Sequence, residues 1–505
     1  MDSKKFLIGS LVAGSAVALY RLLSAQTSSA KPVSSSSAYA ALDAYIDEQM
    51  HRLRIPGASL AVLEGNRVVH QRGFGLARPG GELPTAQTPF FIGSLTKSFT
   101  ALGVMQLVEA GKVDLDAPVQ RYLPWFRVAD LQASEQITLR HLLNQTSGFP
   151  AMAGEVILED YGDGPDATER KVRSMAKLKT NPVGEKCDYC NLNYDVLGLI
   201  IETVSGEAYP DYIQNHIFNP LEMSHSYTKR AVAKQNGLAR GHRHWFGFPV
   251  PAPDLPDPRA ALPSGYLISC VEDMAHYLSA HMNGGRYKDV QILSAPGIDE
   301  LHRGVMEYFP MGIPSGKYGM GWFDIDLGDT KTFTHSGNVP DFSAYMGFIP
   351  DQHKGLVILF NADPYGLPPI TEEIGMGMVA VLAGKQPEPM KWGFLQWIFR
   401  LLPLLPLLQV VGILITLRSA RRISQESSQR LRGWPLWGRH ILLPLIPNLS
   451  FSALLVYLQV TGTLNFLQLF MPDLASVARI SGWLGGIWSV LRTWLVLRTL
   501  GKHQS

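Results

Sequence analysis

The sequence is short of charge. Lys, Arg, Asp and Glu make up 17% of its 505 residues, whereas soluble domains carry about 25%. This shortage indicates that part of the chain lies outside water. The formal net charge is only +2, which provides no attraction for nucleic acid or for an acidic partner. No Lys/Arg-rich run with interleaved aromatic residues marks a nucleic-acid surface either.

Cysteine is scarce as well. Only Cys187, Cys190 and Cys270 are present, too few for a fold built on disulfides. The Cys187-x-x-Cys190 spacing occurs in redox motifs and in half of a zinc site, but no second Cys or His pair lies near it. A local disulfide or two small core residues are the favoured interpretations. No other His, Asp or Glu group has the spacing of metal ligands, so we expect neither a metal nor a cofactor.

Residues 1–37 predict a signal peptide or an N-terminal membrane anchor with a linker. Lys4 and Lys5 precede an apolar run over residues 6–20. Small residues at 24–25 and 28–30 offer cleavage sites, whereas Arg21 directly after the apolar run favours an uncleaved anchor. Both alternatives predict that the following domain is exported.

Long apolar runs are concentrated in the C-terminal part, over residues 386–505. The runs 394–417, 441–460 and 480–497 predict three transmembrane helices, because about 20 apolar residues cross a bilayer core of about 30 Å. A basic loop separates the first two runs, and the positive-inside rule places it in the cytoplasm. The same rule places both chain ends inside and the globular domain outside. We therefore expect a multi-pass cell-membrane protein that contacts lipid and has an extracytoplasmic catalytic domain. The basic residues are Lys4, Lys5, Arg418, Arg421, Arg422, Arg430, Arg432, Arg439, Arg498 and Lys502.

Residues 38–385 predict one globular domain of the α+β class. Strand patterns occur at both of its ends, with a mostly helical middle between them. The expected helices are 38–53, 98–111 and 370–383, and the expected strands are 58–63, 68–74, 332–334, 343–349 and 355–360.

Ser94 and Lys97 form the first candidate catalytic pair. Residues three apart share one face of a helix, so Lys97 can reach the Ser94 hydroxyl. A serine hydroxyl is a weak nucleophile and needs a base or a cation beside it. The pattern alone is common, but apolar residues surround it on both sides. A lysine in such surroundings needs a partner or a function.

Tyr189 and Asn191 form a second motif, Tyr-Cys-Asn. A lysine charge nearby lowers the pKa of a tyrosine from its reference value of about 10, which makes a phenolate general base plausible. Asn191 would hold Lys97 or a substrate amide. By itself the motif favours a hydrogen-bonded core tyrosine over a catalytic one.

His335 and Gly337 form a third motif at the end of an expected strand over residues 331–334. A strand edge beside a nucleophile can bind an extended substrate through backbone hydrogen bonds. Gly337 permits close approach, and His335 would hydrogen-bond the substrate or assist proton transfer. A single histidine in such a place is more often structural.

Together the three motifs resemble those of the serine β-lactamase and penicillin-binding-protein superfamily, in particular its class C-like branch. That branch has Ser-x-x-Lys, Tyr-x-Asn and often His-x-Gly in this order. Further stretches are similar to it at residues 141–148, 263–267 and 318–322. The resemblance covers residues 38–385 and leaves out the C-terminal apolar segment.

The resemblance implies an antiparallel sheet flanked by helices, a mostly helical subdomain, and a site between the two. Ser94 would form an acyl-enzyme, with Tyr189 and Lys97 sharing proton transfer. The backbone N–H groups of Ser94 and Asn338 would form the oxyanion hole. His335 stands where β-lactamases carry lysine, which favours peptidase or esterase work over antibiotic hydrolysis. Cys190 replaces the usual Ser or Ala, and we expect little effect.

The expected function is that of an exported, membrane-anchored serine hydrolase. Its substrates would be small molecules or peptides: D-amino-acid peptides, amides or esters, with cell-wall peptide among them. The alternative is a penicillin-recognising sensor or scaffold that is acylated with little turnover. The basic loop and the chain end assigned to the cytoplasm are too short for a signalling domain, which weakens this alternative.

Overall fold

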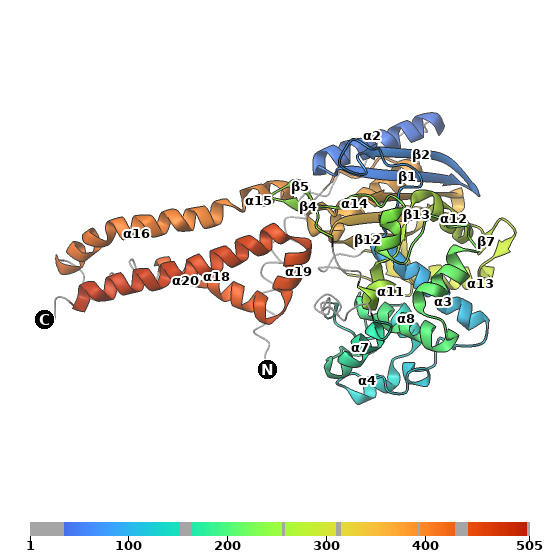
Figure 1. Cartoon of the computed structure of the whole chain (residues 1–505), viewed down its shortest axis with the longest axis horizontal. Coiled ribbons are helices and arrows are strands. Elements are labelled where there is room, and N and C mark those ends of the chain that lie inside the picture. Colours follow the sequence, from blue (N-terminus) through green and yellow to red (C-terminus); the bar gives the residue numbers. More distant parts are fainter. Residues whose placement is uncertain are drawn as a thin grey trace.

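The computed structural model describes residues 35–151, 153, 164–254, 258–309, 315–390, 394–429 and 443–501. The apolar run over 6–20, Lys4, Lys5, Arg430, Arg432, Arg439 and Lys502 lie outside the described residues. Long C-terminal helices project from one side of a globular part (Figure 1).

An eight-stranded antiparallel sheet forms the centre of the globular part, which confirms the predicted α+β class. Its two-residue turn at Gly65–Asn66 joins the first two strands, and the first strand pairs with the last. The two ends of the domain therefore close one sheet. The strand order is β2-β1-β14-β13-β12-β11-β10-β9. The strands are β1 (Gly57–Glu64), β2 (Arg67–Gly75), β9 (Met306–Glu307), β10 (Lys317–Tyr318), β11 (Phe323–Leu327), β12 (Thr330–Val339), β13 (Phe342–Ile349) and β14 (Lys354–Phe360).

Helices cover both faces of the sheet, so its central strands are apolar on both sides. Leu60 and Val62 of β1 belong to the core beneath α2 (Ser35–Leu53) and α14 (Pro368–Leu382). Ala61 and Leu63, which point the opposite way, belong to the core shared with α12 (Val271–Met282).

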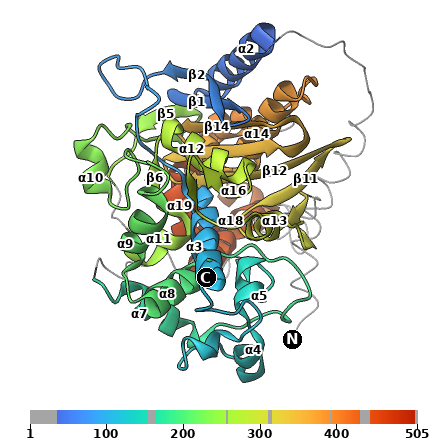
Figure 2. The ribbon, with the colours of Figure 1, turned by 90° about the vertical axis from the view of Figure 1, so that its right-hand side faces the viewer.

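A helical subdomain lies beyond α12, on the same side of the sheet. Figure 2 shows α3 (Thr96–Glu109) between the sheet and this subdomain. Its helices include α4 (Leu131–Gln136), α5 (Leu139–Leu143), α7 (Ala167–Ser174), α8 (Asn191–Ser205) and α11 (Leu262–Gly265). Because α3 contacts both α8 and α11, residues from all three helices meet at its N-terminal end.

Most of the expected elements form, but the expected end of one C-terminal strand is wrong and three strands were not predicted. The prediction that a strand ends at Thr334 is wrong, since β12 continues to Val339 by pairing with β13. His335 therefore lies inside a strand. The strands β9, β10 and β11 were not predicted, because the first two have only two residues each and β11 is half polar.

The C-terminal helices are α15 (Leu395–Leu401), α16 (Leu404–Gln429), α18 (Leu443–Val460), α19 (Thr463–Phe470) and α20 (Pro472–Gly501). Among the described residues, two stretches are long and apolar enough to cross a membrane, Trp397–Arg418 and Pro472–Leu495. A third span is possible if α18 and α19 count as one, although they bend by 91°. The predicted second run forms α18, and the third lies within the longer α20.

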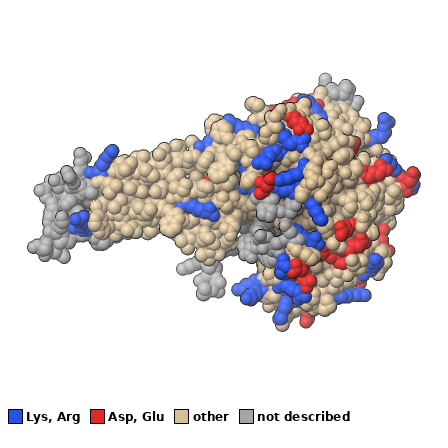
Figure 3. All heavy atoms as spheres, viewed as in Figure 1, with Lys and Arg blue, Asp and Glu red and all other residues tan. Residues whose placement is uncertain are grey.

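Close helix contacts hold α16, α18 and α20 together. Gly412 of α16 faces the Trp488 ring of α20, where an added Cβ would lie 2.1 Å from a ring carbon. The Trp488 Nε1 donates to Thr416 Oγ1 at 2.9 Å, and Gln409 Nε2 donates to the Ser481 carbonyl at 3.1 Å. Small residues and interhelical hydrogen bonds are typical of membrane helix packing. Figure 3 shows few charged residues along these helices between their two ends.

A buried ion pair in the helical subdomain gives a test of the fold. Lys171 of α7 lies 2.8 Å from Asp195 of α8, and their side chains are only 2% and 1% exposed. Lys171→Met leaves the Asp195 carboxylate buried without its cation. We expect this loss to lower the free energy of unfolding by about 3–5 kcal/mol. We expect a clearly lower thermal unfolding temperature in detergent.

The matched controls use the same lysine substitution. Lys288→Met removes a pair with Glu222 in which both side chains are exposed, and such pairs contribute less than about 1 kcal/mol. The double variant Lys171→Met/Asp195→Asn restores most of the lost stability because no charge is left uncompensated. Equal effects of Lys171→Met and Lys288→Met would contradict the buried-pair account.

Candidate active site

Ser94 lies in a 3-10 turn, Gly93–Leu95 (η1), directly before α3. Lys97 follows in the first turn of α3 and is fully buried, whereas Ser94 is half-buried. The Lys97 Nζ donates to Ser94 Oγ at 2.9 Å. The sequence spacing therefore brings the predicted pair into contact, although Ser94 precedes the α-helix instead of starting it.

Lys97 also contacts two oxygens from other helices. Its Nζ donates to Asn191 Oδ1 at 2.7 Å and to the Ser264 carbonyl at 2.6 Å. Both oxygens can only accept hydrogen bonds. They therefore take two hydrogens of Nζ, and the position that faces Ser94 carries either the third proton or the lone pair of a neutral amine. In its neutral form, the Lys97 amine can receive the serine proton.

The Tyr-Cys-Asn motif lies across the site from Ser94 on the N-terminal end of α8. The Tyr189 ring centroid is 4.8 Å from Lys97 Nζ, which is cation–π distance. Gln145 holds this turn, because its Oε1 accepts the Cys190 N–H at 2.9 Å and the Asn193 side-chain amide. Tyr189 and Asn191 thus reach Lys97 from the same turn.

The cysteines of this turn form no disulfide. Cys187, Cys190 and Cys270 are buried and are not joined by disulfides, so of the two interpretations left open, the structure agrees with small core residues. Burial raises the pKa of the Cys187 thiol to about 12, with a smaller contribution from Asp188. A thiol with so high a pKa is a poor nucleophile.

His335 lies in β12, buried against Tyr189 and Tyr318. Its Nδ1 is 2.6 Å from the Ser336 carbonyl, which can only accept, so Nδ1 carries the proton. Nε2 then accepts from the Tyr318 hydroxyl at 3.4 Å. Burial lowers the pKa of His335 to about 3, and the Lys97 charge adds to this. The imidazole is neutral at physiological pH and does not replace the charge of a lysine.

Gly337 and Gly93 allow β12 to touch the turn that carries Ser94. A Cβ on Gly337 would lie 2.1 Å from the Ile92 carbonyl oxygen and 2.9 Å from the Ser94 nitrogen. Gly93 has φ +55°, and a Cβ there would lie 2.5 Å from the Asn338 nitrogen. No other residue type fits either position without backbone movement.

Asn338 contributes its backbone and not its side chain. The side-chain Nδ2 donates to Asp363 Oδ1 at 2.7 Å and to Thr371 Oγ1 at 3.0 Å, so it points toward α14. A two-residue turn joins β12 to β13, so Val339 and every second residue before it bond to β13. The N–H of Asn338 therefore points to the free strand edge, which faces Gly93.

The structure thus brings together all the predicted site residues: Ser94, Lys97, Tyr189, Asn191, His335, Gly337 and Asn338. Sequence reasoning missed the Ser264 carbonyl, which holds Lys97, and Tyr318, which holds His335. Both belong to stretches that were noted only for their general similarity. A backbone acceptor leaves no side-chain signal, which explains the first omission.

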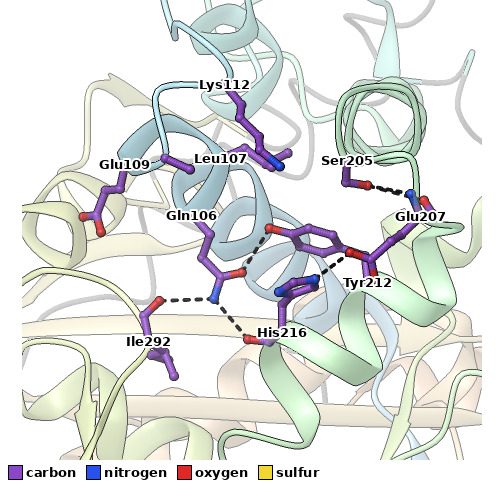
Figure 4. A pocket seen from close by; sticks show the side chains of 10 residues that line it. Gln106, Leu107, Glu109, Lys112, Ser205, Glu207, Tyr212, His216 and Ile292 are labelled. Atoms are coloured by element: carbon purple, nitrogen blue, oxygen red, sulfur yellow. Dashed lines mark hydrogen bonds and ion pairs between the residues drawn. The ribbon is translucent and has the colours of Figure 1, made fainter.

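Two other features of the described residues lie outside this site. A cavity of about 310 Å³ adjoins the last turn of α3, where Tyr212 hydrogen-bonds Gln106 and His216 hydrogen-bonds Glu207 (Figure 4). Ser94 lies before the first turn of the same helix. The cavity holds no nucleophile paired with a base.

No group of metal ligands was predicted from the sequence, but the described residues contain one candidate group. Candidate ligand atoms of His225, Cys270 and Asp273 lie within 4.8 Å of one another. Cys270 Sγ accepts the Asp273 N–H, and Asp273 Oδ2 accepts from Ser226 Oγ and from the His225 N–H. These hydrogen bonds cap α12 and attach it to the segment that contains His225 and Ser226, which accounts for the group as a structural feature.

Known proteins are similar to this chain in sequence, and a solved structure shares its fold. The profile of the family described as Beta-lactamase matches residues 42–372. Penicillin-binding protein 4 of Amycolatopsis lactamdurans is 31% identical over 315 residues, which cover 61% of this chain and 81% of that protein. A solved structure, the octameric penicillin-binding protein homologue from Pyrococcus abyssi, superposes with a TM-score of 0.61 at 31% identity, covering 72% of this chain and 81% of that one.

Protein flp of Staphylococcus aureus strain MW2 is 28% identical over 345 residues, or 67% of this chain. The chain spans 66% of the length of that relative.

Proposed function

Because the chain belongs to the β-lactamase family, we propose that it is a membrane-anchored, extracytoplasmic serine hydrolase that forms an acyl-enzyme on Ser94. The observation that carries this proposal is the hydrogen bond from the fully buried Lys97 to the half-buried Ser94 hydroxyl, at 2.9 Å. The roles of the other site residues follow from their positions around this pair.

In the proposed reaction, the Ser94 oxygen attacks the substrate carbonyl and its proton passes to the Lys97 amine. Tyr189, whose ring contacts Lys97, shares this transfer and protonates the leaving group. The N–H groups of Ser94 and Asn338 stabilise the oxyanion. Water then attacks the ester carbonyl and gives a proton to the Tyr189 phenolate. Ser94 leaves with the proton held by Lys97, which releases the acid product and restores the site.

Neutral His335 supports substrates of the peptidase or esterase type. A lysine at this position would attract a substrate carboxylate, such as that of a β-lactam or of a peptide C-terminus, whereas a buried imidazole with a pKa of about 3 has no charge to offer. Substrates that bind without such a carboxylate therefore suit the site best. We therefore propose D-amino-acid peptides, amides or esters, with cell-wall peptide among them, and place the chain in the class C-like branch.

Two observations support the proposed location. The apolar helices leave the globular domain on one side (Figure 1). Arg418 is the last residue of the first candidate span and Arg498 lies in the last turn of α20. Both helices run away from the globular domain, so the positive-inside rule assigns their far ends to the cytoplasm. The catalytic domain is then extracytoplasmic and the protein is multi-pass.

Covalent labelling tests the proposed nucleophile. We expect a fluorescent β-lactam or a fluorophosphonate to label the full chain in detergent, and Ser94→Ala to abolish labelling. Ser98→Ala is the matched control, since Ser98 lies one turn further along and its hydroxyl donates to the Leu95 carbonyl. Labelling of Ser94→Ala at the wild-type rate would refute the assignment.

The same assay separates the hydrolase from the alternative, a penicillin-recognising sensor or scaffold. Steady turnover of p-nitrophenyl esters or D-alanyl peptides supports the enzyme. A label that reaches one equivalent and never decays, without turnover of either substrate class, supports the sensor.

The pH dependence tests the role of His335. Its folded pKa of about 3 lies below its ordinary value of about 6.5, so the residue is neutral from pH 5 to pH 9. His335→Gln should lower kcat/KM by up to about tenfold, the value of one hydrogen bond, by the same factor throughout this range. A ratio of wild-type to variant activity that changes near pH 6.5 would show that His335 titrates in the working enzyme.

A further inference from the structure

A small hairpin carries exposed apolar residues at the edge of the globular domain. It consists of β4 (His242–Trp245) and β5 (Phe248–Pro251), joined by the two-residue turn Phe246–Gly247. Both turn residues have positive φ, 50° and 79°, as in the tight turns that suit a twisted hairpin. For Phe246 this conformation is uncommon, so something must hold it in place.

Three large apolar side chains of the hairpin are exposed. Trp245 is 36% exposed, Phe248 54% and Val250 42%. Pro249 and Pro251 have no N–H group, so β5 is ill-suited to pair with a further strand. The hairpin therefore presents apolar side chains to its surroundings without offering a sheet edge, which is typical of a contact surface.

The hairpin is fixed to the base of the C-terminal helices. The His244 ring stacks on Tyr365 at 4.8 Å, and Tyr365 stacks on Phe399 of α15 at 5.1 Å. The N–H of Phe246 donates to Asp473 Oδ2 at 2.9 Å, in the first turn of α20. These contacts hold the strained turn at the level where both candidate spans begin (Figure 1).

The chemistry around the hairpin matches a lipid headgroup layer. The Arg54 guanidinium lies over the Phe248 ring at 4.3 Å, and Arg400 lies over the exposed Trp397 at 4.9 Å. Trp at the membrane–water interface and Arg beside phosphate groups are recurring features of membrane proteins. A soluble protein partner would have to reach a surface that adjoins the start of two membrane spans.

We infer that the β4–β5 hairpin inserts Trp245, Phe248 and Val250 into the interface of the phospholipid bilayer, as a second membrane contact of the catalytic domain. This inference rests on the proposed membrane anchoring. A second contact fixes the tilt of the domain relative to the bilayer, because the spans alone attach the domain at one place.

Site-directed spin labelling tests the inference in the full chain, reconstituted into phosphatidylcholine–phosphatidylglycerol vesicles. The native cysteines are all buried, so wild type serves as the unlabelled control and an introduced cysteine is labelled selectively. The test position is Phe248→Cys. Collision rates with oxygen, which partitions into lipid, and with a water-soluble nickel chelate report where the label lies.

Two further cysteine variants serve as references for the accessibility at position 248. Val290→Cys lies in the β7–β8 hairpin (Arg286–Tyr287 and Val290–Gln291), 39% exposed and at the opposite end of the domain (Figure 1). Ile415→Cys lies in α16 within the first candidate span, 56% exposed. Unfolding temperatures of the three variants confirm that each is folded.

We expect the nickel accessibility at position 248 to be several-fold lower than at 290, with oxygen accessibility raised toward that at 415. If 248 matches 290 while 415 is in lipid, the hairpin inference is overturned and the anchoring stands. If 415 is also accessible to nickel, the anchoring itself fails. Low accessibility to both reagents at 248 would mean that protein covers the hairpin, which also overturns the inference.

Discussion

The candidate site depends on the placement of one buried amine. Lys97 is fully buried, and two acceptor-only oxygens, Asn191 Oδ1 and the Ser264 carbonyl, take two of its hydrogens. The remaining position of Nζ is aimed at Ser94 Oγ. A surface lysine would rotate freely and spend most of its time in water. Here α8 and α11 fix the amine, and the direction of proton transfer follows from their positions.

The position of Ser94 beside Lys97 also depends on the large sheet. β12 must run across the turn that carries Ser94 closely enough for its backbone to contact the Ser94 nitrogen, and Gly93 and Gly337 are the residues that permit it. Pairing with β13 fixes which N–H groups face that turn. The Asn338 side chain, bonded to Asp363 and Thr371, attaches the strand to α14 behind it. Burial raises the pKa of Asp363 well above its usual range, and the hydrogen bond from Asn338 opposes this shift.

Side-chain motifs were predictable from the sequence, whereas backbone contributions were not. The pairing of Ser94 with Lys97 follows from helical spacing, whereas Tyr189, Asn191 and His335 were identified because their motifs resemble those of the family. The Ser264 carbonyl and the continuation of β12 past Thr334 depend on tertiary pairing, which local patterns do not record. The strands β9 to β11 are too short and too polar for alternation to reveal them. The hairpin at Trp245–Phe248 was hidden in a proline-rich stretch, where its apolar residues look like an ordinary loop.

The most direct test of the account is the location and rate of acylation. Wild type and Lys97→Met are mixed with an activated ester, quenched at short times, digested, and examined by mass spectrometry. The account predicts an acyl group on the peptide that contains Ser94 in wild type. In Lys97→Met it should form about 100- to 10,000-fold more slowly, the usual contribution of a general base. Acylation of a different residue, or equal rates in the two proteins, would contradict it.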